Sequence, residues 1–408
     1  MTALALGLGL ALLLVSLGLL DGGHEQTIAD GVRFGPGHVV IQAKGYQDTN
    51  SDELLLPARI VSTITDFLQT PNMKRLVRGV SPRLLATGLL SSSANSSGVR
   101  IMGVIPLHER AVSLIPQRMI AGTYLTNDNN LTGVVLGDDL ARKLEVKIGS
   151  KVVLMTQALV PPNTAGKDGS GDEMESTLLR VNGIFRTGLQ AVDANIIQVQ
   201  LPAAQTLLGI ADGQVTLVAL LLDREGDSPL VARALRKQLA ADPVEVLTWR
   251  QSIPMLAQIL ELDHAFNYIM NGVILAMVGL GILNTILMRV LERRYEFGVC
   301  KAVGLRPGQL AIMIIGESLA LTSISLLLGL ALGLSIEHYF ASSGLDLRLL
   351  FRAGLPPALV FDPILYSRLS LNRIIWSVGI VFMMATVISF YPAFKAARTE
   401  LPDALKVL

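Results

Sequence analysis

Four long runs of apolar residues interrupt an otherwise mixed sequence. They are Thr2–Leu20, Ala265–Met288, Gln309–Ile336 and Ile374–Phe394, and together they contain no Lys, Arg or Asp and a single Glu, Glu317. About 20 apolar residues in a helix cross the roughly 30 Å hydrocarbon core of a bilayer. Each run is about long enough, so the pattern predicts four membrane-spanning helices.

The first run has two interpretations, a cleaved signal peptide or a retained span. No basic segment precedes it, and it ends at Leu20-Asp21-Gly22-Gly23 without an Ala-x-Ala cleavage site. A signal peptide normally has a basic start, about 7–15 apolar residues and such a site. We therefore expect a retained span.

Basic residues between the runs predict the orientation, because cytoplasmic loops hold more Lys and Arg. The connection 289–308 carries five basic residues and the tail 395–408 carries three, whereas the longer connection 337–373 carries four. Both termini and the 289–308 connection are thus expected in the cytoplasm. The predicted order is span 1–20, extracytoplasmic domain 21–264, span 265–288, coupling helix and loop 289–308, span 309–336, extracytoplasmic loop 337–373, span 374–394 and tail 395–408.

Strand and helix patterns alternate within 21–264. The expected strands are His38–Gln42, Arg100–Ile105, Gly133–Leu136, Ser150–Thr156, Thr177–Phe185, Val215–Leu222 and Val244–Trp249. The expected helices are Asp52–Leu68, Asp138–Leu144, Pro202–Leu208 and Ser228–Ala240, the last capped by Asp227. Ser91–Gly98 and Pro161–Glu175 are expected loops, either solvated hairpin tips or mobile contact loops. The predicted fold class is a polytopic α-helical membrane protein, with one plus three spans and a large α+β domain inserted after the first.

Composition and motifs argue against several functions. The chain is 51% hydrophobic, and its 34 basic residues against 33 acidic ones provide no basic excess for nucleic acid. Cys300 is the only cysteine, which excludes a disulfide within the chain and a multi-cysteine metal site. Gly166-Lys167 lacks the upstream glycine of a Walker A loop, and no Gly-x-Ser-x-Gly elbow occurs. The histidines, which are scattered, are His24, His38, His108, His264 and His338. We expect no catalytic residues, no metal and no cofactor in this chain.

The 289–308 connection has a helical pattern. Arg289, Glu292, Arg293 and Glu296 fall on one face, and Leu291, Tyr295, Val299 and Ala302 on another. This predicts a short amphipathic helix that continues the second span. Periodicity alone is equally typical of a solvated, positive-inside loop end.

The residues themselves favour a more specific interpretation. Arg293-Arg294-Tyr295-Glu296-Phe297-Gly298-Val299-Cys300-Lys301-Ala302-Val303-Gly304, followed by Leu305-Arg306-Pro307, resembles the helix that docks on the ATPase in the MacB/FtsX/LolC-LolE superfamily of ABC-transporter permeases. The resemblance implies that Arg293, Arg294, Glu296, Phe297, Gly298, Lys301, Ala302 and Gly304 couple the chain to an ATPase.

Two further segments are similar to that superfamily. Tyr391-Pro392 through Arg398 and Pro402 resemble its C-terminal motif, and Val135–Ala141 with Val146–Val152 resemble a segment of its external domain. His24-Glu25-Gln26 is similar to the post-span segment of its lipoprotein-releasing branch. One departure is that the sequence enters the first span without the basic stretch usual in the family, so we expect either a truncated N-terminus or a less firmly anchored first span.

The resemblance implies a transport role and the partners for it. The expected partners are an ABC-type ATPase that binds the ATP and Mg, a second permease subunit of the same or another kind, a lipoprotein or other amphiphilic substrate, a periplasmic chaperone or adaptor, and the lipid bilayer of the inner membrane. The implied activity is release of lipoproteins from that membrane. Efflux of amphiphiles or peptides, and regulation of a cell-wall hydrolase, remain alternatives.

Glu317 is the one charge within the four apolar runs. An ionised carboxylate in a span is costly unless it is paired, so we expect it to pair with an arginine of the coupling helix; a switch role is the alternative. Gly329 and Gly333 on the same run form a Gly-x-x-x-Gly pair. Such a pair allows close helix packing, either within the chain or with a second subunit.

Overall fold

A computed structural model describes residues 2–49, 51–127, 131–157, 174–346 and 364–398. The chain forms two compact units. A helical unit comprises Met1–Gln26, Leu260–Arg352 and Pro363–Leu408, and an α+β unit comprises Thr27–Ile259 and Ala353–Asp362. This division agrees with the predicted fold class, in which a large domain is inserted after the first of four spans.

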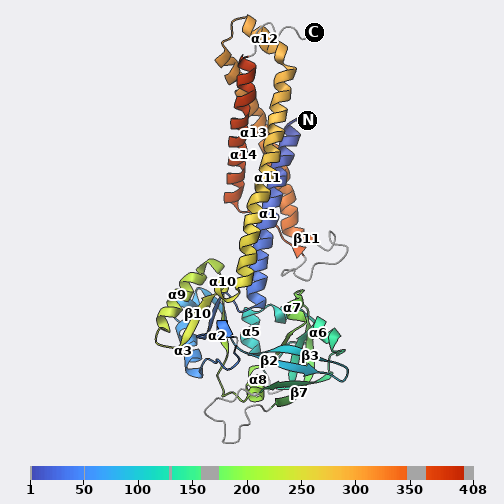
Figure 1. Cartoon of the computed structure of the whole chain (residues 1–408), viewed down its shortest axis with the longest axis vertical. Coiled ribbons are helices and arrows are strands. Elements are labelled where there is room, and N and C mark those ends of the chain that lie inside the picture. Colours follow the sequence, from blue (N-terminus) through green and yellow to red (C-terminus); the bar gives the residue numbers. More distant parts are fainter. Residues whose placement is uncertain (1, 50, 128–130, 158–173, 347–363, 399–408) are drawn as a thin grey trace. The chain divides into compact units, whose positions relative to one another are not determined.

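Four long apolar helices make up most of the helical unit (Figure 1). They are α1 (Thr2–Phe34), α11 (Pro254–Glu292), α13 (Pro307–Ser343) and α14 (Leu371–Arg398). The short helix α12 (Arg294–Ala302) precedes α13, and β11 (Leu345–Asp346) pairs with β12 (Ile364–Leu365). All four helices run past the ends of the apolar runs in the sequence, and the first residues of α11 and last residues of α1 belong to the α+β unit. The hydropathy of a sequence predicts only the part of a helix that prefers lipid. The helix itself continues into polar residues, because its backbone hydrogen bonds do not depend on apolar side chains.

The polar residues beyond the apolar runs are paired in the structure. Asp21 Oδ1 lies 3.1 Å from Arg373 Nη2, and Glu25 pairs with Arg368. His24 Nδ1 lies 3.0 Å from Asp263 Oδ2. These pairs join α1 to α11 and to the start of α14, so polar residues tie the helices together where the apolar packing ends.

Glycines allow α1 and α13 to pack with their backbones in contact. A Cβ placed on Gly329 would lie 2.7 Å from the carbonyl oxygen of Gly7, and one on Gly333 would lie 3.1 Å from Cα of Ala11. Contacts this close leave no room for a side chain. The predicted Gly-x-x-x-Gly pair therefore packs within the chain, against the first span.

The α+β unit is built on a sheet whose order, among the described residues, is β10-β1-β9-β2-β3-β8-β5-β7-β4, with β6 paired to β2 and β7. Its strands are β1 (Val39–Ala43), β2 (Val77–Ser91), β3 (Ser96–Val104), β4 (Met119–Gly122), β5 (Gly133–Gly137), β6 (Lys151–Gln157), β7 (Met174–Phe185), β8 (Ile196–Gln200), β9 (Leu217–Leu222) and β10 (Val244–Thr248). Its helices are α2 (Tyr46–Thr49), α3 (Ala58–Leu68), α4 (Pro71–Lys74), α5 (Pro106–Val112), α6 (Asp138–Lys143), α7 (Gln190–Asp193), α8 (Leu201–Leu208), α9 (Ser228–Gln238) and α10 (Trp249–Ser252).

All seven expected strands and all four expected helices occur, with changed ends. The helix expected from Asp52 starts at Ala58, after Pro57. Asp227 precedes α9 but its side chain makes no capping bond. The loop expected at Ser91–Gly98 is shorter, because β2 and β3 pair from Ser91 and Ser96 onward. The Pro161–Glu175 loop ends earlier, since β7 begins at Met174, and its residues up to 173 lie outside the described part.

Three described strands of the α+β unit, β2, β4 and β8, were not predicted from the sequence, and neither was the short pair β11–β12. The longest, β2, pairs with β9 through its first half and with β3 and β6 through its second. Its first half reads Val-Arg-Gly-Val-Ser-Pro-Arg and has no regular alternation of apolar and polar residues. Long-range pairing on both sides fixes this strand where the local pattern does not.

A buried ion pair lies between β2 and α5. Glu109 accepts bonds from Arg83 Nε and Nη2, each at 2.9 Å, and from Ser81 Oγ at 2.7 Å. The remaining guanidinium nitrogen, Nη1, donates to the carbonyl of Gly35 at 2.6 Å. Gly35 is the residue that follows α1. The two side chains are 2% and 0% exposed. The pair thus fixes the end of α1 to the sheet from inside the α+β unit.

His38 makes the stability of the α+β unit depend on pH. Its Nδ1 accepts the Leu222 N–H at 3.0 Å, and burial, with a smaller effect of the Arg33 charge, lowers the pKa of its imidazole. The unfolded chain therefore binds the proton more readily, so stability falls as pH drops through about 6.5, the ordinary pKa of histidine. We expect the melting temperature of the full chain in detergent to fall more from pH 8 to pH 5 than that of His38→Asn, which keeps an acceptor but does not titrate. Equal falls would contradict this role of His38.

Candidate coupling site

The chain bends between the second span and the helix that follows it. Arg293, with φ −99° and ψ 16°, separates α11 from α12. Its N–H donates to Arg289 O, and its own carbonyl accepts the first bond of α12, from Phe297 N–H. The prediction that α12 simply continues the span was therefore wrong. The chain must return into the bundle as α13 within a few residues, and a straight continuation would carry it away.

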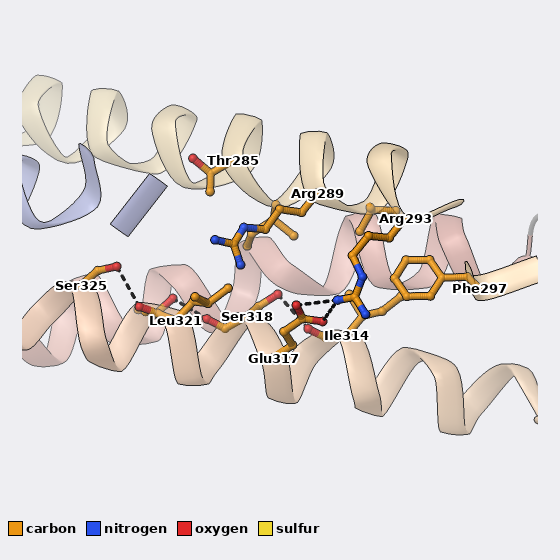
Figure 2. Close-up of a pocket in the computed structure, with 12 residues that line it drawn as sticks. Thr285, Arg289, Arg293, Phe297, Ile314, Glu317, Ser318, Leu321 and Ser325 are labelled. Carbon is orange, nitrogen blue, oxygen red and sulfur yellow. Dashed lines mark hydrogen bonds and ion pairs between the residues drawn. The ribbon is translucent and has the colours of Figure 1, made fainter. Parts of the chain in front are cut away.

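Arg293 joins three helices at this bend. Figure 2 shows its guanidinium group directed at Glu317 on α13, where Nη1 lies 2.6 Å from each carboxylate oxygen. Its Nε donates to Glu296 on α12 at 2.7 Å, and the group lies 5.5 Å from the Phe297 ring centroid. The bond to Glu296, together with Glu317, raises the pKa of Arg293. The expected pairing of Glu317 with an arginine of the coupling helix is thus confirmed.

A small cavity of about 30 Å³ lies beside this ion pair. Ser318, Thr322 and Ser325 line it from α13, and each of their hydroxyls donates to the carbonyl four residues earlier. Arg289 reaches toward the cavity from α11 (Figure 2). The cavity has the size of about one water molecule, so the helices are closely packed around this ion pair.

The turn from α12 to α13 is set by local sequence. Gly304 has φ +103°, and its N–H donates to Lys301 O while the Leu305 N–H donates to Cys300 O. This is the Schellman pattern, which glycine completes without strain. Pro307 begins α13 at a position that needs no N–H, and the Gln309 side chain accepts the Arg306 N–H at 3.1 Å. Gly304 and Pro307 of the family-like motif therefore have a structural role.

One face of α12 is apolar and exposed. Tyr295 is 59%, Val299 40% and Val303 85% exposed, and Ala302 is exposed beside them; we call these four residues the α12 apolar face. Tyr295, Val299 and Ala302 were predicted to share a face, and Val303 was not singled out because it follows the periodic segment. Apolar side chains that remain exposed on a polar helix suggest a surface that a partner covers.

The other predicted coupling residues divide into two groups. Glu296 is exposed and Arg294 and Lys301 are half-buried, and burial lowers the pKa of Lys301. Phe297 and Gly298 are buried, with Phe297 only 5% exposed in the core of the bundle. Phe297 is therefore not available to a partner in this conformation, and it supports Arg293 from inside.

The C-terminal motif is only partly described. Tyr391 and Pro392 lie in α14, where Tyr391 is exposed, Pro392 is buried, and Lys395 Nζ lies 5.8 Å from the tyrosine ring centroid. Arg398 is the last residue of α14, and Pro402 lies outside the described residues. The role predicted for this motif stays a prediction.

The structure brings together two histidines that are far apart in the sequence. The rings of His24 and His264 have centroids 4.0 Å apart, next to Asp263. Within the described ranges, no group of three or more His, Cys, Asp or Glu residues could hold a metal ion.

Comparison with known proteins identifies the family. The model of the MacB-like periplasmic core domain matches residues 1–238, and that of the FtsX-like permease C-terminal domain matches residues 268–401. The chain belongs to the MacB/FtsX superfamily of ABC permeases. It is thus a transporter membrane subunit, multi-pass, with a periplasmic-type domain.

Relatives of this permease include lipoprotein-releasing system proteins and macrolide export proteins. The lipoprotein-releasing system transmembrane protein LolC of Neisseria meningitidis is 22% identical over 98% of this chain and 92% of its own length. LolE of Haemophilus influenzae is 22% identical over 89% and 90%. The macrolide export ATP-binding/permease protein MacB of Bdellovibrio bacteriovorus is 23% identical over 85% and 50%. Among solved structures, the periplasmic region of MacB from Actinobacillus actinomycetemcomitans gives a TM-score of 0.38 at 11% identity over 56% of this chain and 95% of that one.

Proposed function

We propose that this permease is the membrane subunit of a lipoprotein-releasing ABC transporter in the bacterial inner membrane. A separate ATPase subunit, which binds ATP and Mg, docks on the α12 apolar face. A second permease subunit completes the membrane part, and the α+β unit acts on the periplasmic side with a chaperone or adaptor. The observation that carries the proposal is the α12 apolar face, which is exposed and is connected to the bundle through Arg293.

Arg293 connects the docking helix α12 to the membrane helix α13, so a movement of α12 on the ATPase would be transmitted to the bundle. It binds Glu296 on α12 and Glu317 on α13 at once, and bidentate Arg–carboxylate pairs have fixed geometry. A shift of α12 on its ATPase therefore pulls on α13 as well as on the end of α11. The ion pair couples the helices mechanically and does not act on a transported solute.

The likeness to relatives supports lipoproteins as the substrate. It extends over nearly the full length of the LolC and LolE proteins but over about half of MacB. Efflux of amphiphilic molecules is the alternative suggested by the MacB relatives, which also match the external domain.

The test is ATP-dependent release of a lipidated protein from proteoliposomes that contain this permease with its ATPase and partner permease. We expect Val299→Asp to reduce co-purification of the ATPase about 10-fold or more, because it places a charge within an apolar contact, and to abolish release. Charge reversal at Glu296 or Lys301 is expected to weaken ATPase binding as well. A control is Leu107→Asp, at an exposed leucine of the α+β unit, which should retain the ATPase.

Two outcomes would argue against different parts of the proposal. If the ATPase co-purifies equally with Val299→Asp, the docking surface is wrong. If the intact complex hydrolyses ATP but releases no lipidated protein, while it exports a macrolide or peptide, the substrate is wrong and the efflux alternative takes its place.

A further inference from the structure

A second cavity lies at the other end of α13 from the coupling site. It has a volume of about 670 Å³ and is lined by α1, by α13 and by the segment that leads into α14. Glu317 and Glu337 are 20 residues apart on α13, which is about 30 Å along a helix and matches the thickness of the hydrocarbon core. If the coupling site is at the cytoplasmic surface, this bundle-end cavity lies at the level of the headgroups of the opposite leaflet.

Glu337 lines the cavity with an unsatisfied carboxylate. The side chain is 7% exposed, and Oε2 accepts a bond from Ser367 Oγ at 2.7 Å. Its other oxygen, Oε1, has no hydrogen-bond partner among the described residues. A buried carboxylate oxygen without a donor is costly, so an N–H donor that reached Oε1 would stabilise it.

The backbone around Glu337 is arranged to admit this carboxylate. A Cβ on Gly18 would clash with both of its oxygens, so the carboxylate rests directly on the α1 backbone. The carbonyl of Gly18 accepts the Arg368 N–H at 3.0 Å, which holds the 366–368 segment against α1. A side chain on Gly18 would close the place that Glu337 occupies.

The charged residues that line the cavity include one carboxylate without a cation beside it. Asp21, Glu25, Glu337 and Arg368 all line it, together with His338. Asp21 is paired with Arg373 and Glu25 with Arg368. Glu337 is thus the lining carboxylate for which the described structure shows no cationic partner.

Oε1 of Glu337 is buried against the α1 backbone, so a cation can bind it only if it is compact and the side chain turns toward the cavity. A primary ammonium is compact and has three N–H donors. A quaternary ammonium is wider and has no N–H to give to Oε1. The site therefore favours a primary amine over a choline-like group.

The surroundings indicate that the amine belongs to a lipid. Leu334, Leu369 and Ile374 provide an apolar wall for acyl chains. Arg368 is 67% exposed, and an exposed pair such as that with Glu25 contributes little, so its guanidinium can bind a phosphate instead. We propose that the bundle-end cavity binds a phospholipid with a primary-ammonium headgroup, of the phosphatidylethanolamine class, with its amine at Glu337 and its phosphate at Arg368.

Lipid binding by the delipidated full-length protein in detergent tests this site. Native mass spectrometry would follow titration with phosphatidylethanolamine, phosphatidylcholine and phosphatidylglycerol that carry the same acyl chains. We expect the wild type to bind phosphatidylethanolamine about 10-fold more tightly than phosphatidylcholine, and Glu337→Gln to bind the two about equally. The matched control is Glu261→Gln, which removes an exposed carboxylate of α11 outside the cavity and should keep the preference.

Three results would overturn the proposal. One is equal binding of phosphatidylethanolamine and phosphatidylcholine by the wild type, a comparison that needs no variant and decides the question even if Glu337→Gln does not fold. Another is an unchanged preference in a folded Glu337→Gln protein. The last is stronger binding of phosphatidylglycerol than of phosphatidylethanolamine, which would make the cavity an anion site governed by Arg368.

Discussion

Replacing Glu109 by alanine is expected to remove about 3–5 kcal/mol from the free energy of unfolding of the α+β unit, because it leaves the charge of Arg83 buried without a partner. The carboxylate accepts three side-chain bonds and is 0% exposed, so its removal leaves three buried donors without their partner. Chemical denaturation followed by fluorescence measures the loss. Trp249 is buried in this unit, and a Trp376→Phe background leaves it as the only tryptophan.

Two controls separate the effect of the unpaired Arg83 charge on stability from the effect of lost packing. Arg59→Ala removes one partner of an exposed ion pair, with Asp242, and should cost less than about 1 kcal/mol. Replacing both buried partners, as Arg83→Met with Glu109→Leu, should recover much of the loss, because apolar side chains of similar size can replace a buried pair. If Glu109→Ala unfolds at the same denaturant concentration as the wild type, the buried pair does not stabilise this unit.

Introducing leucine at Gly329 is the change expected to damage the helical unit most. The added Cβ would meet the backbone of Gly7 at 2.7 Å, and backbone cannot rotate out of the way as a side chain can. The two helices must separate, at a cost of about 1–3 kcal/mol or more. We expect a lower melting temperature of the purified protein in detergent and less protein recovered from the membrane.

A second glycine on the same helix provides the comparison. A Cβ on Gly316 meets no atom within 4 Å in the part of the chain that the structure describes. Gly316→Leu should therefore melt close to the wild type. Equal destabilisation by the two leucines would show that added bulk, and not the α1–α13 contact, is responsible.

The four long helices could be predicted from the sequence because lipid imposes a simple rule on composition. Their ends could not, because the pairs Asp21–Arg373 and His24–Asp263 join residues that are far apart in the chain. In the α+β unit, strands with regular apolar character such as β9 were found, whereas β2 depends on neighbours on both sides.

The coupling site was predicted in part for a similar reason. An unpaired ionised carboxylate in a membrane span has a high free-energy cost, which predicted a partner for Glu317. Several arginines in the connection 289–308 made an arginine the expected partner. The bend at Arg293 was not predicted, because it follows from the need to re-enter the bundle and not from local periodicity. The burial of Phe297 depends on that bend, so its position was missed together with it.

The turn closed by Gly304 also affects how the coupling helix assembles. Its hydrogen bonds join residues three to five apart, from Cys300 to Leu305 and from Arg306 to Gln309. Contacts so local can form as soon as this piece of chain has been synthesised, before any partner subunit is present. An ATPase would then meet a helix that is already ordered, and little of the association free energy would be lost to restricting the chain.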